Sequence, residues 1–182
     1  MKRIAAVVLG FAAMSAGALA QDQAAIDKAL TAAPAQLKKD ATVIKWKSDY
    51  TYDTLKQGTN NLVCYDKSGM PLNQPFSVEC TDKGNLAREA QNLKTEATPG
   101  GRGAVNAALN KMESDGTRIK PVFGSVWYHA MGPDAEHLRM HMTIAVPGAT
   151  TASMGLPDSG KAGVVWIMNA GTSTAHLMTP GE

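Results

Sequence analysis

The chain has 182 residues, with 18 Lys and Arg against 16 Asp and Glu, and 44% of its residues are hydrophobic. That length suits one domain with its own hydrophobic core. Loss of residues 1–20, which contain Lys2, Arg3 and no acid, would leave 16 basic and 16 acidic residues. A neutral chain lacks the basic excess that nucleic acids and anionic membranes require, so neither is expected as a partner.

The first twenty residues have the pattern of a secretory signal peptide. Lys2 and Arg3 form a basic start, residues 4–13 are apolar, and Ala-Leu-Ala at 18–20 has the small residues of a cleavage site. The apolar stretch is too short to span a bilayer. We therefore predict a periplasmic or secreted protein, with one domain at 21–182 and no transmembrane segment after cleavage. An uncleaved membrane anchor or a buried helix is the alternative.

The chain contains two cysteines, Cys64 and Cys80. An even count in an exported chain predicts a disulfide. The segment between them is rich in turn-forming residues, and a cross-link would constrain it. Two free thiols with a redox or metal-binding role are the alternative, although the spacing fits neither a CxxC motif nor the usual zinc sites.

A short helix and three strands are expected first along the chain. Apolar residues recur at helical spacing within the Ala-rich residues 21–40, and Pro34 should end or kink that helix. The period then changes to two, and turn-forming residues separate three segments rich in β-branched residues. These segments predict an antiparallel meander over residues 41–46, 51–55 and 61–65.

Two helices are expected next. Apolar residues share one helical face in residues 85–95, where Asn85 is a suitable N-cap, and again in residues 104–115. The glycine-rich stretch at 98–103 separates them. It follows no strand and lacks the GxxxxGK[ST] pattern, which argues against a phosphate-binding loop.

Four further segments have the periodicity of strands, namely residues 121–131, 136–146, 163–169 and 174–179. Runs of strands and runs of helices are thus segregated along the chain. This arrangement predicts an α+β fold with an antiparallel sheet, built from the N-terminal three-strand meander and four C-terminal strands.

The segment EHLRMHMTIAV at 136–146 contains two of the four histidines. A strand would place its apolar residues on one face, which predicts that they pack in the core; they are Leu138, Met140, Met142, Ile144 and Val146. His137, Arg139 and His141 would project from the other face. The two histidines would lie roughly 13 Å apart, too far for one metal ion to bind both.

A hairpin between residues 121–131 and 136–146 would bring more polar side chains to that second face. We take the register in which Met131 faces His137, His129 faces Arg139 and Trp127 faces His141, although a one-residue slip would reassign every pair. His129 would then lie about 7–8 Å diagonally from His137 and His141. The candidate ligand-binding residues are Trp127, His129, His137, Arg139 and His141. His176 joins them only if its strand lies alongside.

This face suits a small anion or another small ligand. Arg139 would bind a carboxylate, the histidines would donate hydrogen bonds, and Trp127 would form an apolar wall. The leading functional hypothesis is therefore a periplasmic or secreted binding or accessory protein without a cofactor, whose partner is an unknown small molecule or protein.

Two alternatives stay open for the same face. Copper or zinc binding by His129, His137 and His141 is the first, although the positive charge of Arg139 would repel a cation. The second is an ordinary half-exposed sheet face whose histidines bond to their neighbours, and this is the simplest interpretation of the residues.

Catalysis has less support in the sequence. No GxSxG, HExxH or CxxC motif occurs. Ser173 and His176 are three residues apart, so on one strand they would point to opposite faces. The pattern favours a binding protein over an enzyme and names no catalytic residue, with a small hydrolase as the third hypothesis.

Two blocks of the chain, GTNNLVCYD at 58–66 and SMGLPDSGKAGVVWIMNAGTSTAHLMTPG at 153–181, together with the ATVIKW segment before the first, resemble a group of small exported bacterial proteins of unassigned function. The resemblance implies export, and it transfers no activity, ligand or catalytic residue. If the disulfide is a feature of the group, its second cysteine follows a Pro-containing loop, as Cys80 does.

Overall fold

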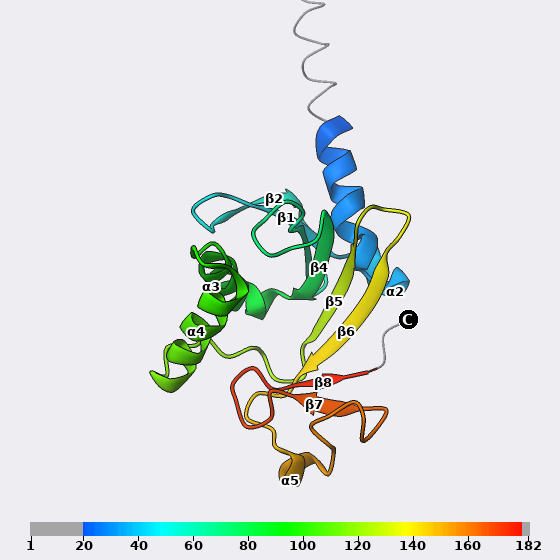
Figure 1. Ribbon diagram of the computed structural model, residues 1–182. Coiled ribbons are helices and arrows are strands. Elements are labelled where there is room, and N and C mark those ends of the chain that lie inside the picture. The colour runs from blue at the N-terminus through cyan, green and yellow to red at the C-terminus, as the bar shows by residue number, and fades with distance from the viewer. Residues whose placement is uncertain (1–19, 180–182) are drawn as a thin grey trace, which may run out of the picture.

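The computed structural model describes residues 20–179, and the predicted signal peptide at 1–20 lies outside them except for its last residue. The described part combines helices with one mixed eight-stranded sheet, which confirms the predicted α+β class (Figure 1). The strands are β1 (Thr42–Trp46), β2 (Tyr52–Lys56), β3 (Leu62–Asp66), β4 (Phe76–Asp82), β5 (Val126–Gly132), β6 (Arg139–Ala145), β7 (Trp166–Met168) and β8 (His176–Met178). Their order across the sheet is β2-β1-β3-β4-β5-β6-β8-β7.

Helical residues 20–29 lead into η1 (Leu30–Ala32) and α2 (Ala35–Lys38). Pro34 separates the last two, as predicted, because its ring cannot continue a helix from the preceding turn. Within residues 20–179 no helix is both long and apolar enough to cross a membrane.

The predicted N-terminal meander is wrong in its pairing. β1 lies between β2 and β3, and it pairs with β3 in parallel, so the sheet is mixed rather than purely antiparallel. Burial explains the order. The first four residues of β3 are buried, whereas β2 is largely exposed. A strand that is apolar on both faces needs neighbours on both sides, and the polar strand takes the edge.

Strand β4 was missed in the sequence, where residues 65–79 were interpreted as an irregular segment between the cysteines. It pairs with both β3 and β5 and thereby joins the two predicted groups of strands into one sheet. Phe76, Val78 and Cys80 do alternate with polar residues, which is the period of a half-buried strand. The Pro and Asn residues just before β4 favour a turn, and the strand was therefore not predicted.

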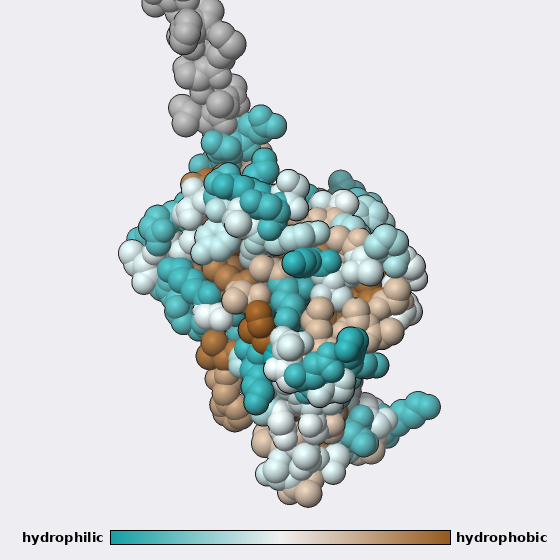
Figure 2. All heavy atoms as spheres, turned by 90° about the vertical axis from the view of Figure 1, so that its left-hand side faces the viewer, coloured by the Kyte–Doolittle hydropathy of each residue, from teal (hydrophilic) through white to brown (hydrophobic). Residues whose placement is uncertain are grey.

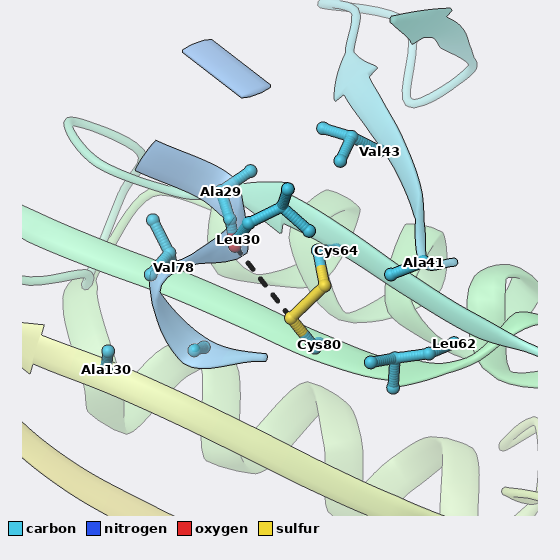
Figure 3. Packing of buried hydrophobic residues seen from close by; sticks show 10 residues of the cluster. Ala29, Leu30, Ala41, Val43, Leu62, Cys64, Val78, Cys80 and Ala130 are labelled. Carbon is cyan, nitrogen blue, oxygen red and sulfur yellow. Dashed lines mark hydrogen bonds between the residues drawn. A yellow bond between two sulfur atoms is a disulfide. The ribbon is translucent and has the colours of Figure 1, made fainter. Parts of the chain in front are cut away.

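The predicted disulfide between Cys64 and Cys80 is present, and it links directly opposed residues of β3 and β4 (Figure 3). It lies in a buried cluster with Ala29 and Leu30 of the N-terminal helical segment and with residues of β1 and β4. Cys80 Sγ is 3.8 Å from the Ala29 carbonyl oxygen, which is a packing contact because a disulfide sulfur carries no proton. The cross-link therefore ties two central strands beneath this helical cover.

The opposite face of the sheet is covered by α3 (Leu86–Glu96), which is followed by α4 (Gly101–Ser114). Leu93 of α3 packs in a second buried cluster with Ile44 and Trp46 of β1 and with Tyr65 of β3. Figure 1 shows α3 and α4 together on one side of the sheet. The predicted cap of α3 is not a side-chain cap, because the Asn85 amide instead bonds to Thr81 and Ser125.

Helix α4 begins inside the glycine-rich stretch, three residues before the predicted start at residue 104. A short connection is sufficient because Gly100 and Gly101 both take left-handed backbone angles, with φ of 108° and 69°. Helix α5 (Thr151–Met154) lies in the long connection between β6 and β7.

The register of the β5–β6 hairpin differs from the predicted one by two residues. His129 faces His141, Trp127 faces Thr143, and Met131 faces Arg139. The connection after Gly132 is longer than the assumed turn, and a two-residue shift keeps every side chain on its predicted face. The core assignment of the methionines is wrong for Met140, whose exposed fraction is 46%.

Strands β7 and β8 complete the sheet beside β6. They cover a small separate cluster that contains Val146, Ala149, Ile167 and Ala175. Because β8 pairs with β6, the strand of His176 does lie alongside that of His141.

Removal of the disulfide should destabilise the fold without changing its topology. We expect Cys64→Ala/Cys80→Ala to lower the free energy of unfolding by about 3 kcal/mol, because the unfolded chain regains the entropy of a loop closed over a separation of 16 residues. Urea denaturation followed by circular dichroism measures this change. A reductant should destabilise the natural sequence but leave the double variant unaffected. Equal midpoints for the two proteins under oxidising conditions would contradict the expectation.

Candidate ligand-binding site

A cavity of about 370 Å³ lies between α3 and the face of the sheet formed by β4, β5, β6 and β8. We call it the imidazole pocket, and it is lined by Lys67, Glu79, Arg88, Glu89, Asn92, Glu96, Pro121, Trp127, His129, Met131, His141, Thr143, Ala145, Met168, His176 and Met178. Figure 2 shows the side of the molecule that carries α3 and α4, where hydrophobic atoms interrupt a largely hydrophilic surface.

Strand register explains why these residues meet. Glu79 of β4 faces His129 of β5, and His129 in turn faces His141 of β6. Neighbouring strands lie about 5 Å apart, so residues in one cross-strand row have adjacent side chains. The rings of His129 and His141 stack with centroids 5.9 Å apart. The polar residues thus form one continuous row under α3.

Strands β7 and β8 supply the neighbouring part of the pocket. Ala145 of β6 faces His176 of β8, which faces Met168 of β7. The adjacent row contains Thr143 and Met178. Three of the four histidines therefore reach the pocket from three different strands.

The floor of the pocket is a buried ion network around Lys67. Lys67 Nζ lies 3.2 Å from Glu79 Oε2 and 2.7 Å from Glu89 Oε1, and all three side chains are at most 7% exposed. The Tyr65 hydroxyl donates to Glu79 Oε1 at 3.2 Å, and the Asn92 amide donates to Glu89 Oε2 at 2.8 Å. Glu89 Oε1 accepts no well-directed hydrogen bond from the described residues. Its partner is the lysine charge alone.

The two carboxyl groups of this network differ in proton affinity. Burial opposes ionisation of both, but Lys67 and His129 together lower the pKa of Glu79 below its ordinary range. At Glu89 burial dominates, and the charge of Glu79 adds to it, so the pKa of Glu89 is raised to about 7 despite Lys67. For Lys67, the two carboxylates outweigh burial and raise its pKa above the ordinary value. At pH 7 Lys67 therefore contacts one ionised carboxylate, that of Glu79, and one carboxyl group, that of Glu89, which is partly protonated.

The histidines of the pocket are held in different ways. His129 Nδ1 lies 3.5 Å from Glu79 Oε2. His176 Nδ1 lies 2.7 Å from the Thr174 carbonyl oxygen, which only accepts, so this nitrogen donates and the neutral ring keeps its lone pair on Nε2. Burial lowers the pKa of both His141 and His176, and nearby positive groups lower each further. Both imidazoles are consequently neutral at pH 7.

Arg88 is the buried cation of the pocket that lacks a carboxylate partner. It is 4% exposed, and its guanidinium donates to the Ile119 carbonyl oxygen. It forms no ion pair with a carboxylate among residues 20–179. Burial and the charge of Arg118 lower the pKa of Arg88 to about 10, although the charges of Glu113 and Glu89 act in the opposite direction, so the group is still cationic at neutral pH.

Three of the five predicted site residues, Trp127, His129 and His141, line the imidazole pocket. His137 and Arg139 are exposed and do not line it. His137 lies in the hairpin connection, with Nδ1 2.8 Å from Asp134 Oδ1.

The pocket offers little for a metal ion in this arrangement. No three His, Cys, Asp or Glu side chains within residues 20–179 converge closely enough to hold one. Stacked rings explain this in part, because ring nitrogens lie in the ring planes and two nearly parallel rings do not aim their lone pairs at a common point.

Four buried charged residues of the pocket were not predicted from the sequence, namely Lys67, Glu79, Arg88 and Glu89. Charged residues in strands and helices normally face solvent, so their burial has no local signature. Glu79 alone carried a usable signal, because it alternates with Val78 and Cys80 and therefore falls on the face opposite the disulfide.

A scan with protein-family models found no match to this chain, and searches of curated proteins and of solved structures found none either. The resemblance of the blocks at 58–66 and 153–181 to small exported bacterial proteins therefore stays a prediction.

The raised pKa of Glu89 predicts a specific dependence of stability on pH. The folded protein retains a proton that the unfolded chain releases near its ordinary pKa of 4.5, so this stabilisation is complete below about pH 4.5 and is lost as the pH rises through about 7. Between these two pH values, the free energy of unfolding of Glu89→Gln should fall by up to roughly 3 kcal/mol less than that of the natural sequence.

Urea titrations at several pH values between these limits measure the effect. Glu136→Gln, which changes an exposed carboxyl in the hairpin connection, is the matched control. Parallel pH profiles for Glu89→Gln and the natural sequence would show that Glu89 does not titrate in this range.

Proposed function

We propose that this chain is an exported binding protein whose imidazole pocket takes a small anionic ligand. The observation that carries the proposal is the meeting of a buried guanidinium that lacks a carboxylate partner with three imidazoles in one cavity of about 370 Å³. Ligand pockets usually combine such a concave space with a few converging polar groups. The ligand-binding arginine is then Arg88 rather than Arg139.

The charges of the pocket support an anion even though carboxylates also line it. Glu79 and Glu89 already share Lys67, and they also accept from Tyr65 and Asn92. Their charge is therefore largely compensated inside the network. Arg88 contacts neither carboxylate, although the charges of Glu113 and Glu89 act on it from further away. An incoming carboxylate would supply the direct charge-assisted hydrogen bonds that guanidinium favours.

The histidines support the same ligand class. His176 feels the positive charge of Arg88, and His141 feels that of Arg139 beside it, which lowers both pKa values beyond the effect of burial. An anion between these groups would reverse that repulsion and favour protonated, donating imidazoles. Anion binding would thus be accompanied by uptake of protons.

Export is supported by the signal-like pattern of residues 1–20 and by the disulfide. Disulfides persist in oxidising compartments such as the periplasm and the extracellular space. We propose this location together with the binding role.

Anion affinity should rise as the pH falls. We expect binding of acetate or benzoate, measured by isothermal titration calorimetry, to strengthen by up to about tenfold per pH unit for each proton taken up, between about pH 8 and about pH 6. Arg88→Gln should abolish binding and Arg88→Lys should weaken it. Arg102→Gln, an exposed arginine of α4, should have no effect. His176→Asn should reduce the pH dependence.

A metal ligand would behave in the opposite way. Imidazoles must be deprotonated to bind Zn²⁺ or Cu²⁺, so metal affinity would fall with falling pH. Binding of either ion, lost in His176→Asn and retained in His137→Asn, together with no binding of the anions, would replace this proposal with the metal alternative.

A further inference from the structure

The imidazole pocket is lined by methionines as well as by charged residues and histidines. Met168 of β7 and Met178 of β8 line the pocket at the β7–β8 edge, and we call these two residues the methionine wall. Met131 of β5 lies beyond His129, at the other end of the pocket. Met168 faces His176 across the β7–β8 ladder, so a thioether stands directly beside an imidazole. Thioether side chains adapt their shape to apolar and aromatic groups.

The side chains of the methionine wall are not fully covered by the rest of the protein. The exposed fraction of Met168 is 39%, and Met178 is only half-buried. A pocket formed only to bind an inorganic anion would gain nothing from exposed thioethers, because such ions interact through hydrogen bonds and charge. Exposed apolar surface inside a cavity does favour a ligand that covers it, by about 25 cal/mol per Å² buried.

The volume of the pocket limits the ligand further. About 370 Å³ lies near the lower end of the range for small-molecule sites, which is roughly 300–1,000 Å³. The space therefore suits a single ring or a short chain together with its anionic group.

We infer that the ligand of the imidazole pocket is a small organic carboxylate with an apolar body, bound with its carboxylate toward Arg88 and the histidines and its body against the methionine wall. This inference rests on the proposed anion site. It adds the class of ligand, and it assigns to Met168 a role in selecting among anions.

A comparison of two carboxylates tests the inference. Benzoate has a ring and acetate only a methyl group, while their charges are equal. We expect benzoate to bind the full chain at least about tenfold more tightly than acetate, as measured by calorimetry at a fixed pH near 6. Met168→Gln should reduce that ratio to about threefold or less by weakening benzoate alone.

Met154→Gln is the matched control. Met154 lies in α5, is also 39% exposed and does not line the pocket, so its replacement should leave both affinities unchanged. Gln is close to Met in length, and a circular dichroism spectrum identical to that of the natural sequence establishes that each variant is folded.

The outcomes separate the two proposals. Equal affinities for acetate and benzoate, both dependent on Arg88, would overturn the apolar selection and keep the anion site. A benzoate preference that Met168→Gln leaves intact would remove the role of the methionine wall. Absence of binding by both carboxylates at millimolar concentrations would overturn both proposals.

Discussion

The ion network of Lys67, Glu79 and Glu89 is the constraint on which the site depends. Three charged side chains are buried between the sheet and α3, and each would be costly to bury alone. Lys67 follows β3, Glu79 lies in β4 and Glu89 in α3, so the network fixes the helix against two strands. Loss of one member from such a network typically costs about 3–5 kcal/mol, because its partners stay charged and buried.

The two faces of the sheet differ in character: one is packed with apolar side chains, and the other carries the pocket. On one face the disulfide, Val78 and Ala130 pack beneath the N-terminal helical segment. The opposite face is apolar under Leu93 and polar from β4 onward, where the ion network replaces hydrophobic packing. An apolar filling of that space would have been at least as stable, because buried ion networks seldom exceed hydrophobic packing in stability. Under the proposed function, the charged groups serve ligand binding rather than stability.

The order of the strands brings residues from separate parts of the chain together in one pocket. The histidines are distant in the chain, and β8 brings His176 beside β6 only because the C-terminal strand returns to pair with it. The loop before β8 is also held from the other side, since Ser173 donates its backbone N–H to Glu113 of α4 at 2.6 Å. The pairing of β8 with β6 and the bond between Ser173 and Glu113 also position Met168 and Met178. The same contacts therefore hold the apolar and the polar parts of the pocket.

The sequence by itself determined the α+β class, the disulfide partners, the break at Pro34, and the face on which Trp127, His129 and His141 lie. These features follow from local periodicity, from Pro geometry and from a count of two cysteines. Only the tertiary structure decided the place of β3, the existence of β4 as the joining strand, and the register of β5 and β6. It also decided that Arg88 and His176 line the pocket, and that His137 and Arg139 do not. Period two fixes which face a residue occupies but not which neighbour it meets, because a shift of two residues leaves every face unchanged.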